Sequence, residues 1–304
     1  MRDLVKPPAL RKGGTIGVAA ISGPVEEARL DTGLAKLRAM GYRVVEASNL
    51  RRRVGFLAGT DQERAWGYRD LVRDPSVDAV LFARGGYGAA RVLPLLDAAA
   101  VRANPKIHLG GSDLTVLFAW LTQMVGLVAF YGPMAAVELP EQDGLDWDAV
   151  LSGETPARHP FPPEDVLSPG GAEAPLVGGC LSLLASLAGT PEALAADGAI
   201  LFWEDVGEAA YRLDRMLTQL ERSGTFDKLR GMVIGSVVPP VGEAPEASRG
   251  WLADRFRGAP FPVAINLPAG HVLRPRSLPL GVRVRLELDG DAALTFLEPS
   301  VELG

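Results

Sequence analysis

Residues that carry metal and disulfide chemistry are scarce in this sequence. Its 304 residues include one cysteine, Cys180, and three histidines, His108, His159 and His271. A single cysteine excludes an internal disulfide and a Cys-x-x-Cys metal site, and it fits a reducing compartment. Three scattered histidines do not have the spacing of zinc ligands. We therefore predict neither a metal nor a cofactor.

Excess positive charge and long apolar runs are also missing. The net charge of −6 gives no electrostatic footprint for nucleic acid or for an anionic membrane. The longest apolar stretch, Val116 to Tyr131, is interrupted by Thr122, Gln123 and Gly126, so it is too short and too broken to cross a bilayer. The basic amino end lacks the apolar segment of a secretory signal. A cytoplasmic protein without nucleic-acid or membrane partners is expected.

What the sequence does contain, in its first half, is an alternation of strand and helix patterns. Apolar runs of strand length occupy 15–20, 42–46, 77–83 and 107–109, with helical patterns between them. Thr60 and Glu63 form a capping-box pattern at the start of one helix. Such alternation predicts an α/β fold with a parallel sheet and ligands at the carboxyl ends of its strands.

The length allows two domains or one large α/β unit, and the composition shifts over residues 138–175. We expect an N-terminal parallel-sheet α/β domain over residues 1–150. Residues 151–175, within this shift, are rich in proline and have few periodic apolar positions, so a linker or an inserted surface segment is expected there. Residues 176–304 contain several strand patterns and fewer helices, which predicts a strand-rich α+β domain.

Two glycine-rich loops follow neighbouring strands of the first domain. One is RGGYG at 84–88, and the other is GGSD at 110–113. A strand that ends at glycines and restarts as a helix would expose the Ser112 hydroxyl, with the Asp113 amide beside it. The Gly86 amide could approach a ligand oxygen from the other loop. Ser112 or Asp113 could instead only cap the helix, and RGGYG lacks the spacing of a dinucleotide fingerprint.

A nucleophilic serine needs a base, and the three histidines differ in suitability. His108 lies inside the strand that precedes Ser112, too close in sequence to fold back onto it. His159 lies in the expected linker, where a solvated loop residue is the simpler interpretation. His271 follows NLPAG at the end of a predicted strand, a position typical of a catalytic base held by a scaffold.

The base needs an acid that orients it. Glu204 closes the apolar strand AILFW, where a carboxylate is otherwise unexpected. Its neighbour Asp205 is the rival, but adjacent strand residues point to opposite faces, and Asp205 could cap the next helix. The order Ser, Glu, His is acceptable because a triad is defined by geometry. These residues could also be merely structural.

The chain resembles the LD-carboxypeptidases of serine peptidase family S66, which include murein tetrapeptide carboxypeptidases and microcin C immunity peptidases. The motifs are ARGGYGAARVLPLLD, GGSDLT, YGPM, EDVGEAAYRLDRMLTQL and LPAGH, in this order. The resemblance implies two domains, with Ser112 as nucleophile, Glu204 as acid and His271 as base. It also implies that the backbone amides of Gly86 and Asp113 form the oxyanion hole.

The implied activity is metal-independent removal of the terminal D-Ala from murein tetrapeptides during peptidoglycan recycling, by a homodimer. Arg84 is a candidate for binding the terminal carboxylate, or a loop salt-bridge partner. Tyr87 is a second candidate contact. Trp203 could stack on a base, although a core position is more usual. The alternatives are an immunity-type peptidase for aminoacyl adenylates and a non-catalytic peptide-binding protein.

Two positions depart from the family pattern. Gly111 replaces the usual aromatic residue before the nucleophile, which predicts a more open site wall. Cys180 stands where the family has asparagine, and it cannot make the hydrogen bonds of an amide. A small buried apolar residue is the simplest interpretation of Cys180.

Overall fold

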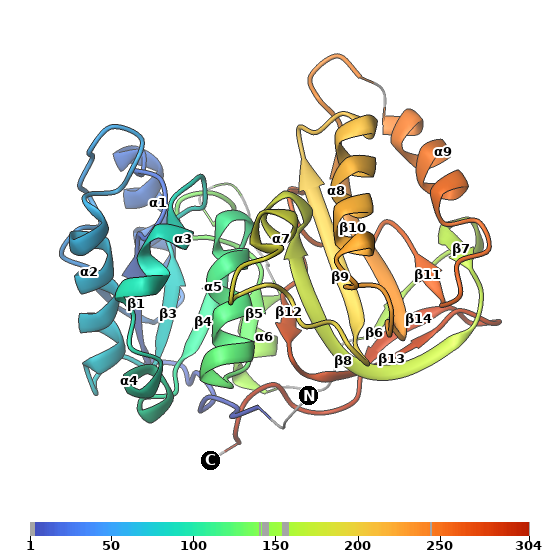
Figure 1. Ribbon diagram of the computed structural model, residues 1–304. Helices are drawn as coiled ribbons and strands as arrows, with labels where there is room; N and C mark the ends of the chain where they lie inside the picture. The colour runs from blue at the N-terminus through green and yellow to red at the C-terminus, as the bar shows by residue number, and fades with distance from the viewer. Residues whose placement is uncertain (1–3, 140, 142–145, 154–157, 244, 304) are drawn as a thin grey trace.

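The computed structural model describes residues 4–139, 141, 146–153, 158–243 and 245–303. It contains two mixed sheets side by side (Figure 1). Strands of the first sheet, in spatial order, are β12 (Leu278–Leu280), β5 (Ala129–Tyr131), β4 (Ile107–Gly110), β3 (Ala79–Phe82), β1 (Thr15–Ala19) and β2 (Arg43–Glu46). All are parallel except β12, which pairs antiparallel with β5. The expected α/β architecture is confirmed.

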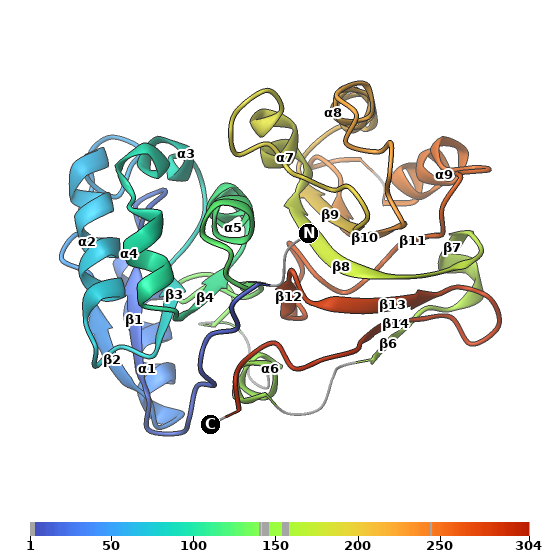
Figure 2. The same cartoon turned by 60° about the horizontal axis from the view of Figure 1, so that its bottom comes forward.

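Helices cover both faces of this sheet (Figure 2). They are α1 (Glu27–Ala39), α2 (Asp61–Arg73), α3 (Ala89–Val92), α4 (Ala98–Ala103), α5 (Thr115–Trp120) and α6 (Trp147–Ser152). The capping box at the start of α2 is confirmed, because Thr60 Oγ1 accepts the Glu63 N–H and the Glu63 carboxylate accepts the Thr60 N–H. That exchange satisfies two backbone donors at the helix start.

The strand order creates a switch point. The chain moves outward from β1 to β2 and then returns past β1 to β3, β4 and β5. The loops after β1 and β3 therefore leave the sheet in opposite directions and flank a crevice at its carboxyl edge. The serine turn follows β4 at the same edge.

The second sheet is built mainly from the C-terminal half. Its strands, in spatial order, are β6 (Arg158–Pro160), β14 (Ala293–Phe296), β13 (Arg283–Glu287), β8 (Gly171–Cys180), β9 (Ile200–Val206), β10 (Gly231–Val238), β11 (Val263–Ala264) and β7 (Val166–Ser168). Strands β8 to β11 are parallel. Helices α7 (Leu181–Leu187), α8 (Ala210–Arg222) and α9 (Pro245–Arg255) lie over one face (Figure 2).

The structure corrects the prediction of a linker at 151–175. Residues 154–157 lie outside the described residues, but β6, β7 and the first half of β8 pair within the second sheet. Pro160 ends β6, and Pro175 lies within β8 where its ladder with β13 stops and its ladder with β9 begins, so neither proline interrupts a continuous ladder. His159 is 4 % exposed within β6, so it is not the solvated loop residue that was expected.

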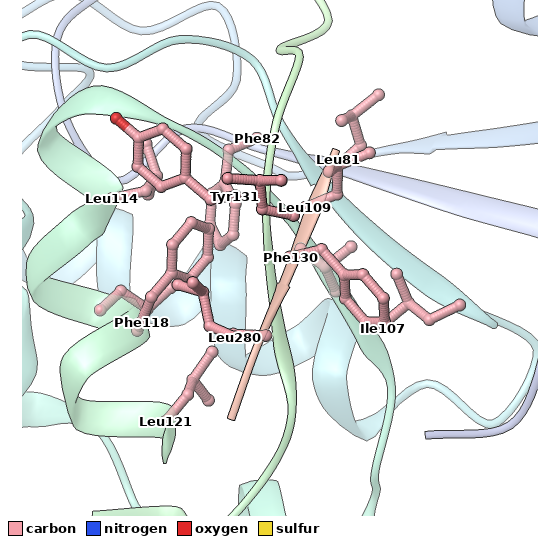
Figure 3. Packing of buried hydrophobic residues seen from close by; sticks show 14 of the residues in the cluster. Leu81, Phe82, Ile107, Leu109, Leu114, Phe118, Leu121, Phe130, Tyr131 and Leu280 are labelled. Atoms are coloured by element: carbon pink, nitrogen blue, oxygen red, sulfur yellow. The ribbon is translucent and has the colours of Figure 1, made fainter. Parts of the chain in front are cut away.

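One apolar cluster runs from the first sheet into the second, and Figure 3 shows its packing around β4, β5 and β12. The ring of Tyr131 packs edge-on against Phe202 of β9, with 5.5 Å between centroids. A second cluster fills the space under α7, α8 and α9. The shared core holds the ends of β4, β5 and β9 next to one another.

In the described part of the chain, no helix is both long and apolar enough to cross a membrane.

Candidate active site

The turn after β4 holds Ser112 in a strained conformation. A 3₁₀ turn (Ser112–Leu114) leads directly into α5, and Ser112 has φ +58°. This left-handed conformation costs a non-glycine residue about 1–3 kcal/mol and is concentrated at functional sites. Sharp strand-to-helix turns of this kind expose nucleophilic serines. The predicted turn is confirmed, but the positive φ falls on the serine and not on a glycine.

Glycine is needed around this turn for close packing. A Cβ on Gly111 would lie 3.2 Å from the Gly132 carbonyl oxygen, and a Cβ on Gly85 would lie 2.7 Å from the Ser112 Cβ. The backbone of the loop after β3 therefore lies directly against the serine. Gly86 follows at φ +108°.

The amides expected to form an oxyanion hole are free in this structure. Within the described residues, neither the Gly86 N–H nor the Asp113 N–H donates to a protein acceptor. The Asp113 carboxylate has a different task. It accepts hydrogen bonds from Ser22 Oγ (2.6 Å) and from the Ala89 N–H (2.8 Å), which fastens the loops after β1 and β3 to the serine turn.

Glu204 and His271 are in direct contact. Glu204, near the carboxyl end of β9, is fully buried, and its Oε2 accepts from His271 Nδ1 (2.7 Å) and from the His271 N–H (3.1 Å). Gly270 has φ +100°, and a Cβ there would lie 2.3 Å from the same carboxylate oxygen. Only glycine therefore allows the loop to bring His271 onto Glu204.

The charge of Glu204 sets the acid–base behaviour of the imidazole. Burial lowers the pKa of His271, but the hydrogen bond and the negative charge of Glu204, with Glu138 and Asp205 adding to them, outweigh it and raise the pKa above its ordinary value. Because Nδ1 is engaged by the carboxylate, Nε2 is the nitrogen left to exchange a proton with a reacting group.

Asp205 points to the other face of the strand, as its alternation with Glu204 predicts. Its carboxylate accepts the Ser182 N–H (2.7 Å) and the Val206 N–H (2.8 Å). It therefore caps α7, the helix that precedes β9 in sequence, and not the following helix as expected.

Ser112 and His271 line one small cavity. Its wall also includes Tyr131, Glu138 and Gly270. The three residues expected to form a triad thus converge from the turn after β4, the end of β9 and the loop after β11. Within the described ranges, no three His, Cys, Asp or Glu side chains gather closely enough to hold a metal ion.

Tyr131 is the site residue that the sequence did not single out. Its hydroxyl accepts the Ser112 N–H (2.8 Å) and donates to Glu204 Oε1 (2.6 Å). In Figure 3 its ring lies in the apolar cluster while the hydroxyl points out of it. The Ser112 amide is therefore occupied by Tyr131, unlike the neighbouring amides of Gly86 and Asp113. The YGPM motif is the available signal in the sequence, but there Tyr131 also ends an apolar run, which indicates a core residue.

The three expected substrate contacts have different outcomes. Arg84 is half-buried beside the Gly86 loop and donates to the Pro24 carbonyl (3.2 Å), while its buried Nε has no hydrogen-bond partner among the described residues. Tyr87 is 55 % exposed. Trp203 is fully buried in the second core, where its Nε1–H faces Met232 Sδ (3.2 Å). The prediction of Trp203 as a ligand contact is wrong, because this face of β9 packs under the helices.

Cys180 lies opposite Glu204 in the β8–β9 ladder. It is buried, its N–H donates to Thr115 Oγ1 (2.9 Å), and its sulfur lies 3.2 Å from Ser182 Oγ. The expected small buried residue is confirmed.

Comparison with known proteins covers most of the chain. Residues 16–132 match the family model for the LD-carboxypeptidase N-terminal domain, and residues 173–286 match that for the C-terminal domain. The probable murein peptide carboxypeptidase of Bacillus subtilis is 35% identical, over 92% of this chain and 91% of that one. The murein tetrapeptide carboxypeptidase of Pseudomonas aeruginosa is 30% identical, over 90% and 93%.

Solved structures agree with these relatives. The muramoyltetrapeptide carboxypeptidase from Oxalobacter formigenes superposes with a TM-score of 0.81 at 31% identity, covering 94% of this chain and 99% of that one. The immunity protein MccF, in complex with glutamyl sulfamoyl guanosine, has a TM-score of 0.88 at 24% identity, covering 98% and 100%. The latter likeness is one of fold.

Proposed function

The chain belongs to the LD-carboxypeptidase family, and we propose that it is a serine carboxypeptidase that removes the terminal D-Ala from murein tetrapeptides. One observation carries the proposal: Ser112, in a strained conformation, and His271, hydrogen-bonded to Glu204, line the same cavity. Relatives named as murein peptide carboxypeptidases support the substrate class.

The chemistry is acyl transfer. His271 Nε2 takes the Ser112 proton as Oγ attacks the carbonyl of the L-centred residue. Glu204 holds the imidazole and stabilises its positive charge. The free amides of Gly86 and Asp113 receive the oxyanion; each such donor is worth roughly a hundredfold or more in rate. His271 then protonates the leaving D-Ala amine, and water hydrolyses the acyl-enzyme.

The substrate's terminal carboxylate needs donors. Arg84 is the candidate, because its guanidinium lies beside the Gly86 loop and its Nε has no hydrogen-bond partner in the part of the chain that the structure describes. Tyr87 is exposed on the same loop and can cover the substrate from outside. A cytoplasmic homodimer that acts in peptidoglycan recycling completes the proposal.

The alternative substrate, an aminoacyl adenylate, has less support here. MccF is bound to a glutamyl compound in a solved structure, and its fold is similar. In this chain, however, Trp203 is buried and cannot stack on a base, and Glu138 on the cavity wall would repel an acidic side chain. A purely binding role would not explain why Ser112 is held in a strained conformation beside free amides.

The test is release of free D-Ala from lysine and diaminopimelate tetrapeptides, with a chelator present. An aspartyl adenylate analogue with a hydrolysable bond serves as the competing substrate. Release from a tetrapeptide supports the proposal, whereas cleavage of the adenylate alone would replace it.

Tyr131→Phe is expected to lower kcat about 10- to 100-fold, with KM changed little. The substitution removes a hydrogen bond to a buried carboxylate, worth about 1.5–3 kcal/mol, and frees the Ser112 amide. The ring still packs against Phe202, so the fold should be retained. Steady-state kinetics and thermal melting together measure both effects.

Tyr68→Phe is the matched control. Tyr68 is equally buried, and its hydroxyl bonds His108, away from the site. If both variants lose the same activity, the hydroxyl of Tyr131 has no special role in positioning Glu204 and the serine turn.

A further inference from the structure

One carboxylate on the cavity wall is not used by the triad. Glu138 lies in the turn after β5, and its Oε2 accepts the Met134 N–H at 2.7 Å, which fixes its position. It lines the small cavity with Ser112 and His271. It also lines a larger, open cavity of about 570 Å³ beside it. Glu138 and His271 are the residues common to both walls.

The charge of Glu138 has no cationic partner in contact with it. In the described part of the chain, no Lys or Arg nitrogen lies within ion-pair distance of this carboxylate. Arg29 lines the larger cavity, but its guanidinium is taken by Glu141 (2.6 Å) and by the carbonyls of Ala136 and Val137. A half-buried carboxylate without a counter-ion is costly, and a ligand cation would offset that cost.

Burial raises the pKa of Glu138 to about 7, and the Met134 N–H and the charges of His271 and Arg29 lower it only in part. A bound ammonium would favour the ionised form.

The larger cavity has an apolar side as well. Val137, Val272 and Leu273 line it, and Leu273 is 73 % exposed. A wall of this kind accommodates the methylene stem of a long side chain while its charged end reaches a polar partner. The two features together fit an aliphatic chain that ends in an amine.

We propose that Glu138 binds the side-chain ammonium of the diamino acid that supplies the scissile carbonyl. This inference rests on the proposed function and adds the substrate's specificity-determining contact. The methylenes lie along Val137 and Val272, and the ammonium meets the Glu138 carboxylate at the junction of the two cavities. A neutral side chain of the same length loses that ion pair, and an acidic one is repelled.

Two tetrapeptides differing only at the third residue provide the test, one with lysine and one with norleucine. Wild-type protein is expected to cleave the lysine peptide with a kcat/KM ten- to a hundredfold higher, as for a hydrogen bond between charged groups. Glu138→Gln should remove the preference, mainly by raising KM for the lysine peptide. Assays are run on the alkaline plateau of activity, so that an altered pKa of His271 does not contribute.

Two controls accompany the variant. Glu138→Gln keeps an oxygen for the Met134 N–H, and an unchanged melting temperature verifies the fold. Glu27→Gln removes the same charge from an exposed helix position and should leave the preference intact. A wild-type protein without preference, or a preference that survives Glu138→Gln, overturns the inference.

Binding separates this inference from the proposed reaction. In the Ser112→Ala background, calorimetry should give a Kd for the lysine peptide at least about tenfold below that for norleucine, and Glu138→Gln should equalise them. If wild-type protein cleaves neither peptide but the difference in Kd between the lysine and norleucine peptides persists, the proposed reaction is wrong and the proposed ammonium subsite at Glu138 stands. If neither peptide binds, the subsite is wrong as well.

Discussion

Ser112→Ala is expected to reduce D-Ala release by at least about 10⁴-fold, because removing the nucleophile of a triad leaves only binding and oxyanion stabilisation. The substitution deletes one oxygen and leaves the Tyr131 contact with the backbone amide of residue 112 in place. Substrate binding should therefore persist. The measurement is single-turnover release of D-Ala by wild type and variant, with calorimetric binding of the same peptide.

Ser112→Gly separates catalysis from stability at this position. Ser112 has φ +58°, a conformation that costs a non-glycine residue about 1–3 kcal/mol and that glycine adopts freely. Glycine therefore relieves the strain in the folded state, but its greater conformational freedom in the unfolded chain offsets part of this stabilisation. The glycine variant should be inactive yet at least as stable to heat as Ser112→Ala. Release that survives in either variant would show that the turn only caps a helix.

The sequence was sufficient for the parts of the site that depend on local pattern. A strand, a glycine pair and an apolar helix specify the turn around Ser112 without knowledge of distant partners. Parallel strands place their carboxyl ends on one edge, so the loop after β3 and the serine turn had to meet. Alternation along β9 separated Glu204 from Asp205 correctly.

Features that depend on contacts between distant segments could not be predicted from local sequence pattern. Tyr131 and Glu204 are 73 positions apart in the sequence, yet their side chains form a hydrogen bond. The apolar neighbours of Tyr131 predicted a core residue, and its ring does lie in the core, but its hydroxyl points out of it. Trp203 stands next to Glu204 in the sequence, which suggested a contact with a ligand, but its side chain lies on the other face of β9 and packs under α8. The strands β6, β7 and β8 are held by distant partners, β14, β11, and β13 with β9, whereas the composition of residues 151–175 suggests a loop.

Glu204→Gln is expected to lower kcat by about 10⁴-fold, the loss typical of the acid in a Ser-His-Asp triad. The amide is neutral, so it no longer stabilises the imidazolium that forms when His271 takes the Ser112 proton. The glutamine side chain must also place its NH₂ group where a carboxylate oxygen of Glu204 now accepts a hydrogen bond from Tyr131 or from His271. An orientation that satisfies all three donors of the wild-type site is lost.

The pH profile gives this variant a signature that misfolding cannot reproduce. General-base catalysis requires neutral His271, so activity rises with pH through its pKa. Glu204 raises that pKa against the lowering effect of burial; without the carboxylate, burial prevails and the acid limb of kcat/KM should move to lower pH. Asp205→Asn is the control, because that buried carboxylate caps α7: it should lower the melting temperature and shift the limb less. An acid limb unmoved by Glu204→Gln would mean that the group titrating in the reaction is not His271 held by Glu204.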